Sequence, residues 1–303
     1  MKVFITGGTG FVGSSLTREL ANKGHEITVL DRTIKTQNEF SSTVSFIEAD
    51  STVRGSWQDI AAQHEIFINL AGASIFSRWN EKTKLAIRES RILTTINLVD
   101  AISRNKNEGV RLFSTSGVGY YGFHEDEELK EEEPSGEDFL ASVAEDWENA
   151  ANQARAFHAK VIICRFGIVL GRRGGALQQM LPIYKAYLGA PLGSGRQWFP
   201  WVHEQDLVNI FLFLIDQKDI EGPINCTAPQ PVRNFEMTKA IGAVLGVPTL
   251  PFGVPGFMMK IILGELGNVL LKGQKAIPGR LTQLGFQFNF PTIHTALKDL
   301  LKQ

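Results

Sequence analysis

Three glycines with fixed spacing follow the first apolar run of the chain. They are Gly7, Gly10 and Gly13, and the segment that they open has helical spacing. Gly7 permits a tight turn, Gly10 lets a pyrophosphate approach the backbone, and Gly13 allows a helix to pack closely against a strand. The free N–H groups at such a helix start bind phosphate. The pattern therefore predicts a dinucleotide-binding turn made by Gly7, Gly10, Phe11, Val12 and Gly13.

The second apolar run ends in two charged residues that favour different cofactors. Asp31 is placed to bond the ribose hydroxyls of adenosine, which favours NAD(H). Arg32 follows it and can hold a 2′-phosphate, which favours NADP(H). If Asp31 turns outward, Arg32 can stack on the adenine and bind the phosphate. We therefore expect NADP(H), with NAD(H) as the alternative.

Polar and small residues after the later apolar runs extend the predicted cofactor site. Those after the third run would lie beside the adenine ring, and the small residues after the fourth let the backbone approach the cofactor. An arginine just beyond the fourth run is a candidate for a further phosphate contact. These additional candidates are Asp50, Ser51, Leu70, Ala71, Gly72 and Arg78.

Apolar and amphipathic segments alternate through the first half of the chain and must position these residues. In the helix predicted over residues 81–104, the spacing places Leu85, Ile92, Ile96 and Val99 on one apolar face. The strand segments are rich in Val, Ile and Phe, as in a sheet covered on both faces. Their alternation with helices predicts an α/β protein with right-handed crossovers and a doubly wound parallel sheet of the Rossmann type. Strands are predicted over residues 2–6, 27–30, 44–48, 66–70, 110–114 and 161–164, and helices over residues 13–23, 81–104 and 136–157.

The composition changes along the chain and indicates three parts. Residues 1–171 are predicted to form an NAD(P)-binding domain whose sheet is partly completed by later segments. Gly and Pro become frequent after this point, so residues 172–254 are predicted to form a smaller substrate-side lobe with helices over 177–188 and 204–216. Residues 255–303 hold two helical patterns between Gly- and Pro-marked turns, which predicts a C-terminal helical extension.

The composition argues against several other classes of protein. Lys and Arg number 31 and Asp and Glu 32, so a net charge of −1 gives no general attraction to nucleic acid or anionic membranes. The only cysteines, Cys164 and Cys226, form neither a disulfide framework nor a zinc motif, and we expect no metal. No signal peptide and no uncharged apolar stretch of about 18 residues is present, so we expect a cytoplasmic protein without a membrane span.

Several further segments resemble the extended short-chain dehydrogenase/reductase superfamily. They are residues 114–122 (STSGVGYYG), residues 165–171 (RFGIVLG) and residues 201–207 (WVHEQDL). Smaller blocks resemble one subgroup, the uncharacterised epimerase family proteins, also labelled nucleoside-diphosphate-sugar epimerases or cell-division-inhibitor-like proteins. Among these blocks are residues 88–91 (RESR), 192–198 (LGSGRQW) and, in what resembles that group's C-terminal domain of unknown function, residues 273–281 (GQKAIPGRL).

The resemblance covers essentially the whole chain and carries expectations about function. It implies an NAD(P)(H)-dependent oxidoreductase or epimerase that acts on an unidentified carbonyl or nucleotide-sugar-like substrate. It also implies that Ser116 is a catalytic residue and that Arg165 lies on the cofactor side of the site. The two long helices become candidate surfaces for a homodimer.

The proton-transfer pair of that superfamily, a Tyr with a Lys four residues later, is absent from this chain. By resemblance, the two positions are Phe139 and Val143, and neither side chain can move a proton. Hydride transfer needs only correct placement of cofactor and substrate, whereas proton transfer adds about 10²–10⁴-fold. The loss therefore weakens catalysis without excluding it.

Three alternatives follow from the missing pair. Another phenol can substitute, and Tyr120 and Tyr121 are the nearest in sequence. Ser116 can orient a carbonyl while water or Glu145 supplies protons. Finally, the chain can bind nucleotide without turnover, as a sensor or interaction protein. Packing of the strand end is the competing interpretation of both tyrosines.

Candidate substrate-binding residues lie in the second half of the chain. Arg196 and Gln197 occur in a Gly-rich loop suited to anion or hydroxyl recognition, and Trp198 can stack on a base or belong to the core. His203 can act as an acid or base or be structural. The acidic run over residues 124–133 is interpreted as a solvated loop, with a mobile acidic flap beside the active site as the alternative.

Overall fold

The Val-, Ile- and Phe-rich segments form one seven-stranded parallel sheet in the computed structural model, which describes residues 1–34 and 40–302. The strand order is β11-β7-β5-β4-β1-β2-β3, so the chain winds outward in both directions from β1 and β4. The sheet strands are β1 (Lys2–Thr6), β2 (Glu26–Asp31), β3 (Val44–Glu48), β4 (Ile66–Asn69), β5 (Arg111–Gly117), β7 (Lys160–Phe166) and β11 (Gly222–Cys226). Short paired strands outside it are β6 (Glu128–Leu129), β8 (Ile168–Leu170), β9 (Trp198–Phe199), β10 (Trp201–His203), β12 (Val232–Arg233) and β13 (Lys275–Ala276).

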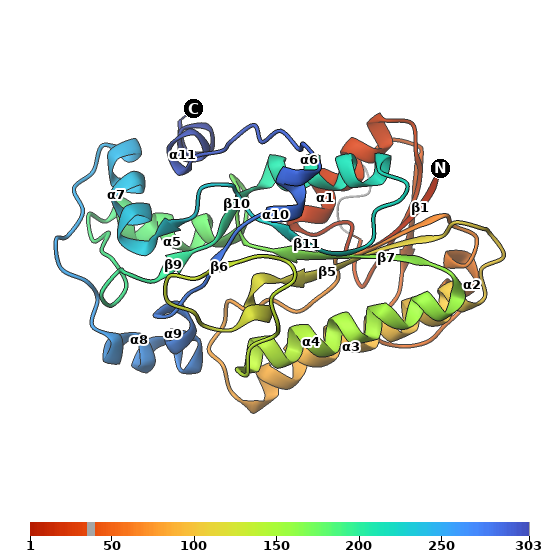
Figure 1. Ribbon diagram of the computed structural model, residues 1–303, viewed down its shortest axis with the longest axis horizontal. Helices are drawn as coiled ribbons and strands as arrows, with labels where there is room; N and C mark the ends of the chain where they lie inside the picture. Colours follow the sequence, from red (N-terminus) through yellow and green to blue (C-terminus); the bar gives the residue numbers. More distant parts are fainter. Residues whose placement is uncertain (35–39, 303) are drawn as a thin grey trace.

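Helices cover both faces of the sheet, and a separate group of helices stands at one end (Figure 1). The α-helices are α1 (Phe11–Asn22), α2 (Trp57–Ala61), α3 (Glu81–Ser103), α4 (Phe139–Asn152), α5 (Gly175–Lys185), α6 (Glu204–Asp216), α7 (Asn234–Leu245), α8 (Gly256–Leu263), α9 (Glu265–Leu270), α10 (Gly279–Gln283) and α11 (Ile293–Leu301). Two 3₁₀ turns, η2 (Val118–Tyr121) and η3 (Gln153–Phe157), follow β5 and α4. Within residues 1–34 and 40–302, no helix has the length and apolarity that crossing a bilayer requires.

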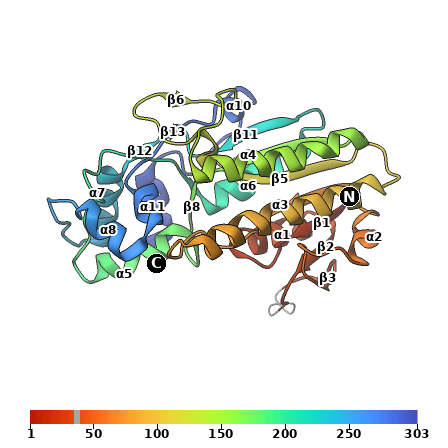
Figure 2. The same cartoon turned by 90° about the horizontal axis from the view of Figure 1, so that it is seen from below.

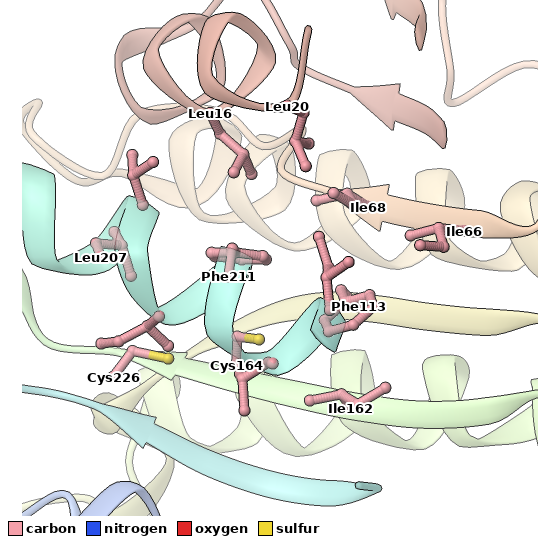
Figure 3. Packing of buried hydrophobic residues seen from close by; sticks show 14 of the residues in the cluster. Leu16, Leu20, Ile66, Ile68, Phe113, Ile162, Cys164, Leu207, Phe211 and Cys226 are labelled. Carbon is pink, nitrogen blue, oxygen red and sulfur yellow. The ribbon is translucent and has the colours of Figure 1, made fainter. Parts of the chain in front are cut away.

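The core consists of one apolar layer on each face of the sheet. Leu16 and Leu20 of α1 and Phe211 of α6 belong to the same cluster as Ile68 and Phe113 of the strands (Figure 3). On the other face α2, α3 and α4 cover a second buried cluster, and α3 and α4 run side by side (Figure 2). Because all seven strands are parallel, their carboxyl ends meet at one edge, where loops can gather chemistry.

The predicted apolar face of α3 is wrong in part: Val99 is buried and Ile92 half-buried, but the other two residues are exposed. Leu85 is 53% exposed and Ile96 is 36% exposed, whereas Ile87, Leu98 and Ile102 are buried. The buried face also takes up threonine and asparagine side chains that hydrogen-bond to neighbouring elements, so apolar residues alone do not mark it. Two other boundaries shift: α4 begins at Phe139, where Asp138 caps the helix by accepting from Leu140 N–H, and η3 ends it.

The C-terminal segment holds four helices among its described residues, where the sequence pattern predicted two. Gly264 has φ +63° and separates α8 from α9, and Pro278 and Pro291 bracket the short α10 and precede α11. Positive φ is strained for most side chains, so a helix ends there. β13 from this segment pairs in parallel with β6, which ties the C-terminal part to the acidic run.

Candidate functional site

The glycine turn has the backbone geometry that the spacing predicts. Gly7 has φ +73°, and a Cβ on it would lie 3.0 Å from the backbone of Leu70 and Ala71 at the end of β4. A Cβ on Gly13 would overlap the carbonyl oxygen of Gly7, so only glycine lets α1 start this close to β1. Gly10 is the N-cap of α1 and has no side chain over the first N–H groups. The turn therefore leaves a backbone cradle for a phosphate.

Phe11 fixes the far side of this turn. Its ring lies where Cβ atoms on Gly171, Gly174 and Gly175 would stand, so the loop between β8 and α5 closes over it. Val12 is half-buried and packs against the core cluster of α1 and α6. The side chains of both residues thus pack against neighbouring elements and hold the turn.

Asp31 turns inward, contrary to the outward orientation on which the NADP(H) expectation rested. Its Oδ2 accepts hydrogen bonds from the backbone N–H of Thr9 (3.1 Å) and from the Thr9 hydroxyl (2.5 Å). The contact ties the end of β2 to the glycine turn. Thr9 was not among the candidates, because a threonine in the variable position of a glycine motif carries no signal of its own.

Arg32 lies exposed at the adenosine end of the sheet. Its charge helps to hold the pKa of Asp50 below its ordinary value, although hydrogen bonds from Thr52 are the larger cause. The carboxylate of Asp50 accepts from both Thr52 N–H (2.9 Å) and Thr52 Oγ1 (2.7 Å). Ser51 is buried against Thr94 of α3 at 2.8 Å, so its hydroxyl supports the fold.

The loop after β4 borders the glycine turn on its other side. Leu70 and Ala71 touch Gly7 through their backbones, and Gly72 is exposed. The guanidinium carbon of Arg91, from α3, lies 3.2 Å from the position that a Cβ on Gly72 would take. Arg78 is exposed beside Gly264 of the C-terminal segment.

A buried network lies directly beneath the carboxyl end of β5. The Ser116 hydroxyl donates to Glu148 Oε1 at 2.7 Å, and Arg165 grips the same carboxylate through Nε (2.9 Å) and Nη2 (2.8 Å). Arg165 Nη1 donates to the Tyr121 hydroxyl (3.0 Å) and to the Glu131 carbonyl oxygen (3.2 Å). The predicted cofactor role of Arg165 therefore needs correction, because its donors are committed to the interior.

The two candidate phenols differ in their surroundings. The Tyr121 hydroxyl donates to Asn225 Oδ1 at 2.7 Å, and burial raises the pKa of this phenol to about 12. Tyr121 is thus protonated at neutral pH, and its proton is committed to Asn225. Tyr120 is half-buried, and the Arg165 guanidinium lies 3.5 Å from its ring centroid. Of the two, only Tyr120 retains a phenol without a hydrogen bond among the described residues.

The start of α4 is apolar where the superfamily carries its Tyr and Lys. Phe139 packs edge-on against Trp79, with ring centroids 5.3 Å apart, and Val143 is buried beside Leu266 of α9. The first nine residues of α4 include neither tyrosine nor lysine. The C-terminal segment therefore helps to fill this position with hydrocarbon.

The side chains of the consecutive residues Arg196, Gln197 and Trp198 have separate surroundings. Gln197 Nε2 donates to the carbonyl oxygens of Leu192 and Leu270, both at 3.0 Å, so its amide holds loops together. Trp198 Nε1 donates to Asp126 at 2.9 Å, and Arg196 is exposed. Trp198 also lines a groove of about 650 Å³ beside β13 and α10.

His203 is a structural residue at the start of α6. Its Nδ1 accepts from Gln205 N–H at 3.0 Å, and its ring stacks on Phe290 with centroids 3.8 Å apart. Burial lowers the pKa of His203 to about 4, although Asp299 lies 3.4 Å from its Nε2. The ring therefore caps α6 and packs on Phe290, at the edge of a small pocket that Glu204, Gln205 and Asp299 also line.

The acidic run is mostly solvent-exposed, as expected for a solvated loop, but it is anchored at two points. Glu128 belongs to β6 and pairs with Lys275 at 2.9 Å. Glu131 is buried, and its carboxylate accepts the backbone N–H groups of Asn225 (3.0 Å) and Arg280 (3.1 Å). Counting charges in the sequence cannot distinguish this one buried glutamate from the exposed acidic residues around it.

Comparison with known proteins identifies both parts of the chain. Residues 3–226 match the model of the NAD dependent epimerase/dehydratase family, and residues 254–300 match a domain of unknown function (DUF1731). The chain is 39% identical over 305 residues to the Arabidopsis thaliana protein named epimerase family protein SDR39U1 homolog, chloroplastic. This match covers 100% of the present chain and 87% of the relative.

Solved structures agree with the fold. Human epimerase family protein SDR39U1 (isoform 2), crystallised with NADPH, has a TM-score of 0.85 and 32% identity, with 99% of each chain covered. UDP-glucuronic acid 4-epimerase of Bacillus cereus, in complex with UDP-glucuronic acid and NAD, has a TM-score of 0.80 at 18% identity, covering 100% of this chain and 99% of that one. The second likeness shows the fold alone. The Rossmann-type fold and the family expected from the sequence are confirmed, and binding of a nicotinamide cofactor is supported.

Proposed function

The chain belongs to the NAD dependent epimerase/dehydratase family, and from this premise we propose that it binds NADP(H) and transfers hydride to or from a carbonyl or nucleotide-sugar-like substrate. The observation that carries the proposal is the glycine turn. Gly7 and Gly13 fit only without a Cβ, and Gly10 leaves the first N–H groups of α1 uncovered. The cofactor, when bound, supplies or accepts the hydride, and the protein contributes binding, orientation and electrostatics.

NADP(H) is favoured over NAD(H) by the charges at the adenosine end. Arg32 is exposed there, and Asp31 is occupied by Thr9. A guanidinium can bind a 2′-phosphate through two parallel hydrogen bonds. The human relative crystallised with NADPH supports the same choice.

Calorimetric titration of the purified protein with NADPH and NADH tests the proposal. We expect NADPH to bind at least about tenfold more tightly, which corresponds to roughly 1.4 kcal/mol. Mass spectrometry of molecules released on denaturation identifies any retained cofactor. A tenfold preference for NADH would make Asp31 a ribose ligand, and no binding of either cofactor at millimolar concentration would end the proposal.

A second function, nucleotide sensing without turnover, is favoured by one observation. The proton of Ser116 is donated to Glu148, and the nearby start of α4 has no phenol or ammonium to replace it. Cofactor oxidation measured across a broad panel of carbonyl compounds separates the two functions. Robust turnover excludes a pure sensor, and tight cofactor binding with no turnover favours one.

A further inference from the structure

Arg91 is a half-buried cation that no acidic residue neutralises in the described part of the chain. Its Nη1 donates to the carbonyl oxygens of Ala73 (3.1 Å) and Ile87 (2.9 Å), and its guanidinium lies 5.3 Å from the ring centroid of Trp147. A guanidinium has five N–H donors. Among residues 1–34 and 40–302, the Nε and Nη2 groups of Arg91 have no hydrogen-bond partner.

This arrangement is costly for the protein alone. Burial lowers the pKa of Arg91 to about 10, and no nearby carboxylate opposes the shift. By contrast, the buried guanidinium of Arg165 on β7 donates hydrogen bonds to both carboxylate oxygens of Glu148. A partly desolvated charge without a counter-charge costs free energy, so the presence of Arg91 here points to a counter-charge that arrives with a ligand.

The position of Arg91 identifies which ligand charge can reach it. Its guanidinium lies under Gly72, which is exposed and has no Cβ to cover it. The neighbouring residue, Ala71, has its backbone nitrogen 3.0 Å from the position of a Cβ on Gly7. The cation therefore lies beside the phosphate turn. It lies on the β4–β5 side of that turn, away from Arg32 and the adenosine end.

We propose that Arg91 binds the pyrophosphate of the dinucleotide, at the phosphate that carries the nicotinamide ribose. The exposed gap at Gly72 admits the phosphate oxygens, and the free Nε and Nη2 donors meet them as a fork. This inference rests on the proposed function, because it needs a dinucleotide at the glycine turn. The cofactor site predicted from the sequence consisted of residues after the strands and at the start of the first helix. Arg91 adds a residue from α3 to that site.

The competing explanation is that Arg91 merely holds the loop after β4 through Ala73. The two explanations differ in their effect on stability without ligand. If Arg91 is structural, a neutral residue of similar length loses a hydrogen bond and lowers the melting temperature. If Arg91 serves the ligand, Arg91→Met removes a desolvated charge and leaves the melting temperature unchanged or raised, at the expense of binding.

The experiment compares wild type, Arg91→Met and Arg91→Lys, with Arg88→Met as a matched control one turn earlier on α3, where Arg88 pairs with Asp146. Dissociation constants are measured by calorimetry for NADPH, ADP-ribose and 2′,5′-ADP, together with melting temperatures without ligand. For Arg91→Met we expect about tenfold or greater loss for NADPH and ADP-ribose. We expect less than about twofold loss for 2′,5′-ADP, which lacks the second phosphate of the pyrophosphate. Arg91→Lys should keep part of the affinity, because it keeps the charge but not the fork.

Each other result has a defined meaning. Unchanged NADPH affinity in Arg91→Met, with normal wild-type binding, overturns this inference and leaves the proposed function intact. Equal losses for NADPH and 2′,5′-ADP with a lowered melting temperature show a structural role and also overturn it. Wild-type protein that binds neither NADPH nor NADH overturns both proposals. A loss in Arg88→Met equal to that in Arg91→Met shows a general charge effect and rejects the specific contact.

Discussion

The Ser116 hydroxyl donates to the carboxylate of Glu148 across 2.7 Å, and Ser116 is only 2% exposed. A serine whose proton is committed in this way can accept a hydrogen bond at its oxygen but has no second proton to donate. The strand-end serine therefore cannot polarise a carbonyl unless this contact opens. For this reason the sequence motif alone is not sufficient evidence that Ser116 is catalytic.

Removing Glu148 should destabilise the protein strongly. Glu148→Ala leaves the Arg165 guanidinium buried without its carboxylate, and breaking a buried pair costs about 3–5 kcal/mol. Urea unfolding at neutral pH measures the change in the free energy of unfolding. Glu145→Ala is the control on the same helix, since Glu145 is exposed and should change stability by less than about 0.5 kcal/mol. A loss below about 1 kcal/mol for Glu148→Ala would contradict the role of the network.

Two glycines of the phosphate turn should separate folding from binding. In Gly13→Ala the new Cβ overlaps the Gly7 carbonyl oxygen, so we expect about 3 kcal/mol of destabilisation together with loss of NADPH binding. In Gly10→Ala the nearest atom to the new Cβ is the Gly7 carbonyl oxygen at 3.2 Å, so the fold should persist while the methyl group obstructs the pyrophosphate. Calorimetry and thermal melts distinguish the two. Tight NADPH binding by Gly10→Ala would show that the cofactor does not approach this turn.

The sequence predicted the site best where backbone geometry decides. Gly7, Gly10 and Gly13 are specified by clashes that any side chain would cause, and strong apolar runs such as that of β1 form strands in almost any context. The parallel order follows from alternating strands and helices. These features depend on a few neighbouring residues, so a single sequence is enough to predict them.

The sequence failed where a side chain can choose among partners distant in the chain. Arg165 was expected near the cofactor, but Glu148 and Tyr121 hold it inside. His203 was a substrate candidate, but its Nδ1 caps α6 and its ring stacks on Phe290, 87 positions later. Arg91 lay within a recognised block, yet its importance depends on the absence of a neighbouring acid, which only the folded structure reveals.

The preference for NADPH over NADH should depend on the two charged residues at the end of β2, Asp31 and Arg32. Arg32→Ala should weaken NADPH about tenfold and leave NADH within twofold, because only NADPH carries the 2′-phosphate. Asp31→Asn should favour NADPH further, since it removes a negative charge near that phosphate while the amide oxygen can still accept from Thr9. Competing titrations with both cofactors measure these changes. Equal losses for NADPH and NADH in Arg32→Ala would place Arg32 elsewhere than on the 2′-phosphate.

The two neighbouring tyrosines should behave differently on loss of their hydroxyls. Tyr121→Phe strands Asn225 Oδ1 and one Arg165 donor, which should cost about 1–3 kcal/mol of stability. It should not alter the pH dependence of any turnover, because this phenol has a pKa of about 12 and lies buried. Tyr120→Phe should leave stability nearly unchanged. A new pH dependence in Tyr121→Phe, with its stability intact, would make Tyr121 a proton donor.

Acid should destabilise the protein through His203. Its pKa is about 4 when folded and 6.5 in the unfolded chain, so the unfolded state binds the extra proton first. The contribution of His203 to the free energy of unfolding should therefore be fully present above pH 6.5. It should be lost as the pH drops toward 4, by up to about 3 kcal/mol at 1.4 kcal/mol per pKa unit. Asp299 and Arg172 face the ring, and they shift its pKa in opposite directions.

The substitution His203→Asn tests this assignment. Asn can still cap α6 by accepting from Gln205 N–H, and the loss of stability between pH 7.5 and 5.0, measured by urea unfolding, should become smaller. His294→Asn, at an exposed position on α11, is the matched substitution that controls for loss of a histidine. An unaltered slope in His203→Asn would assign the acid sensitivity to other groups.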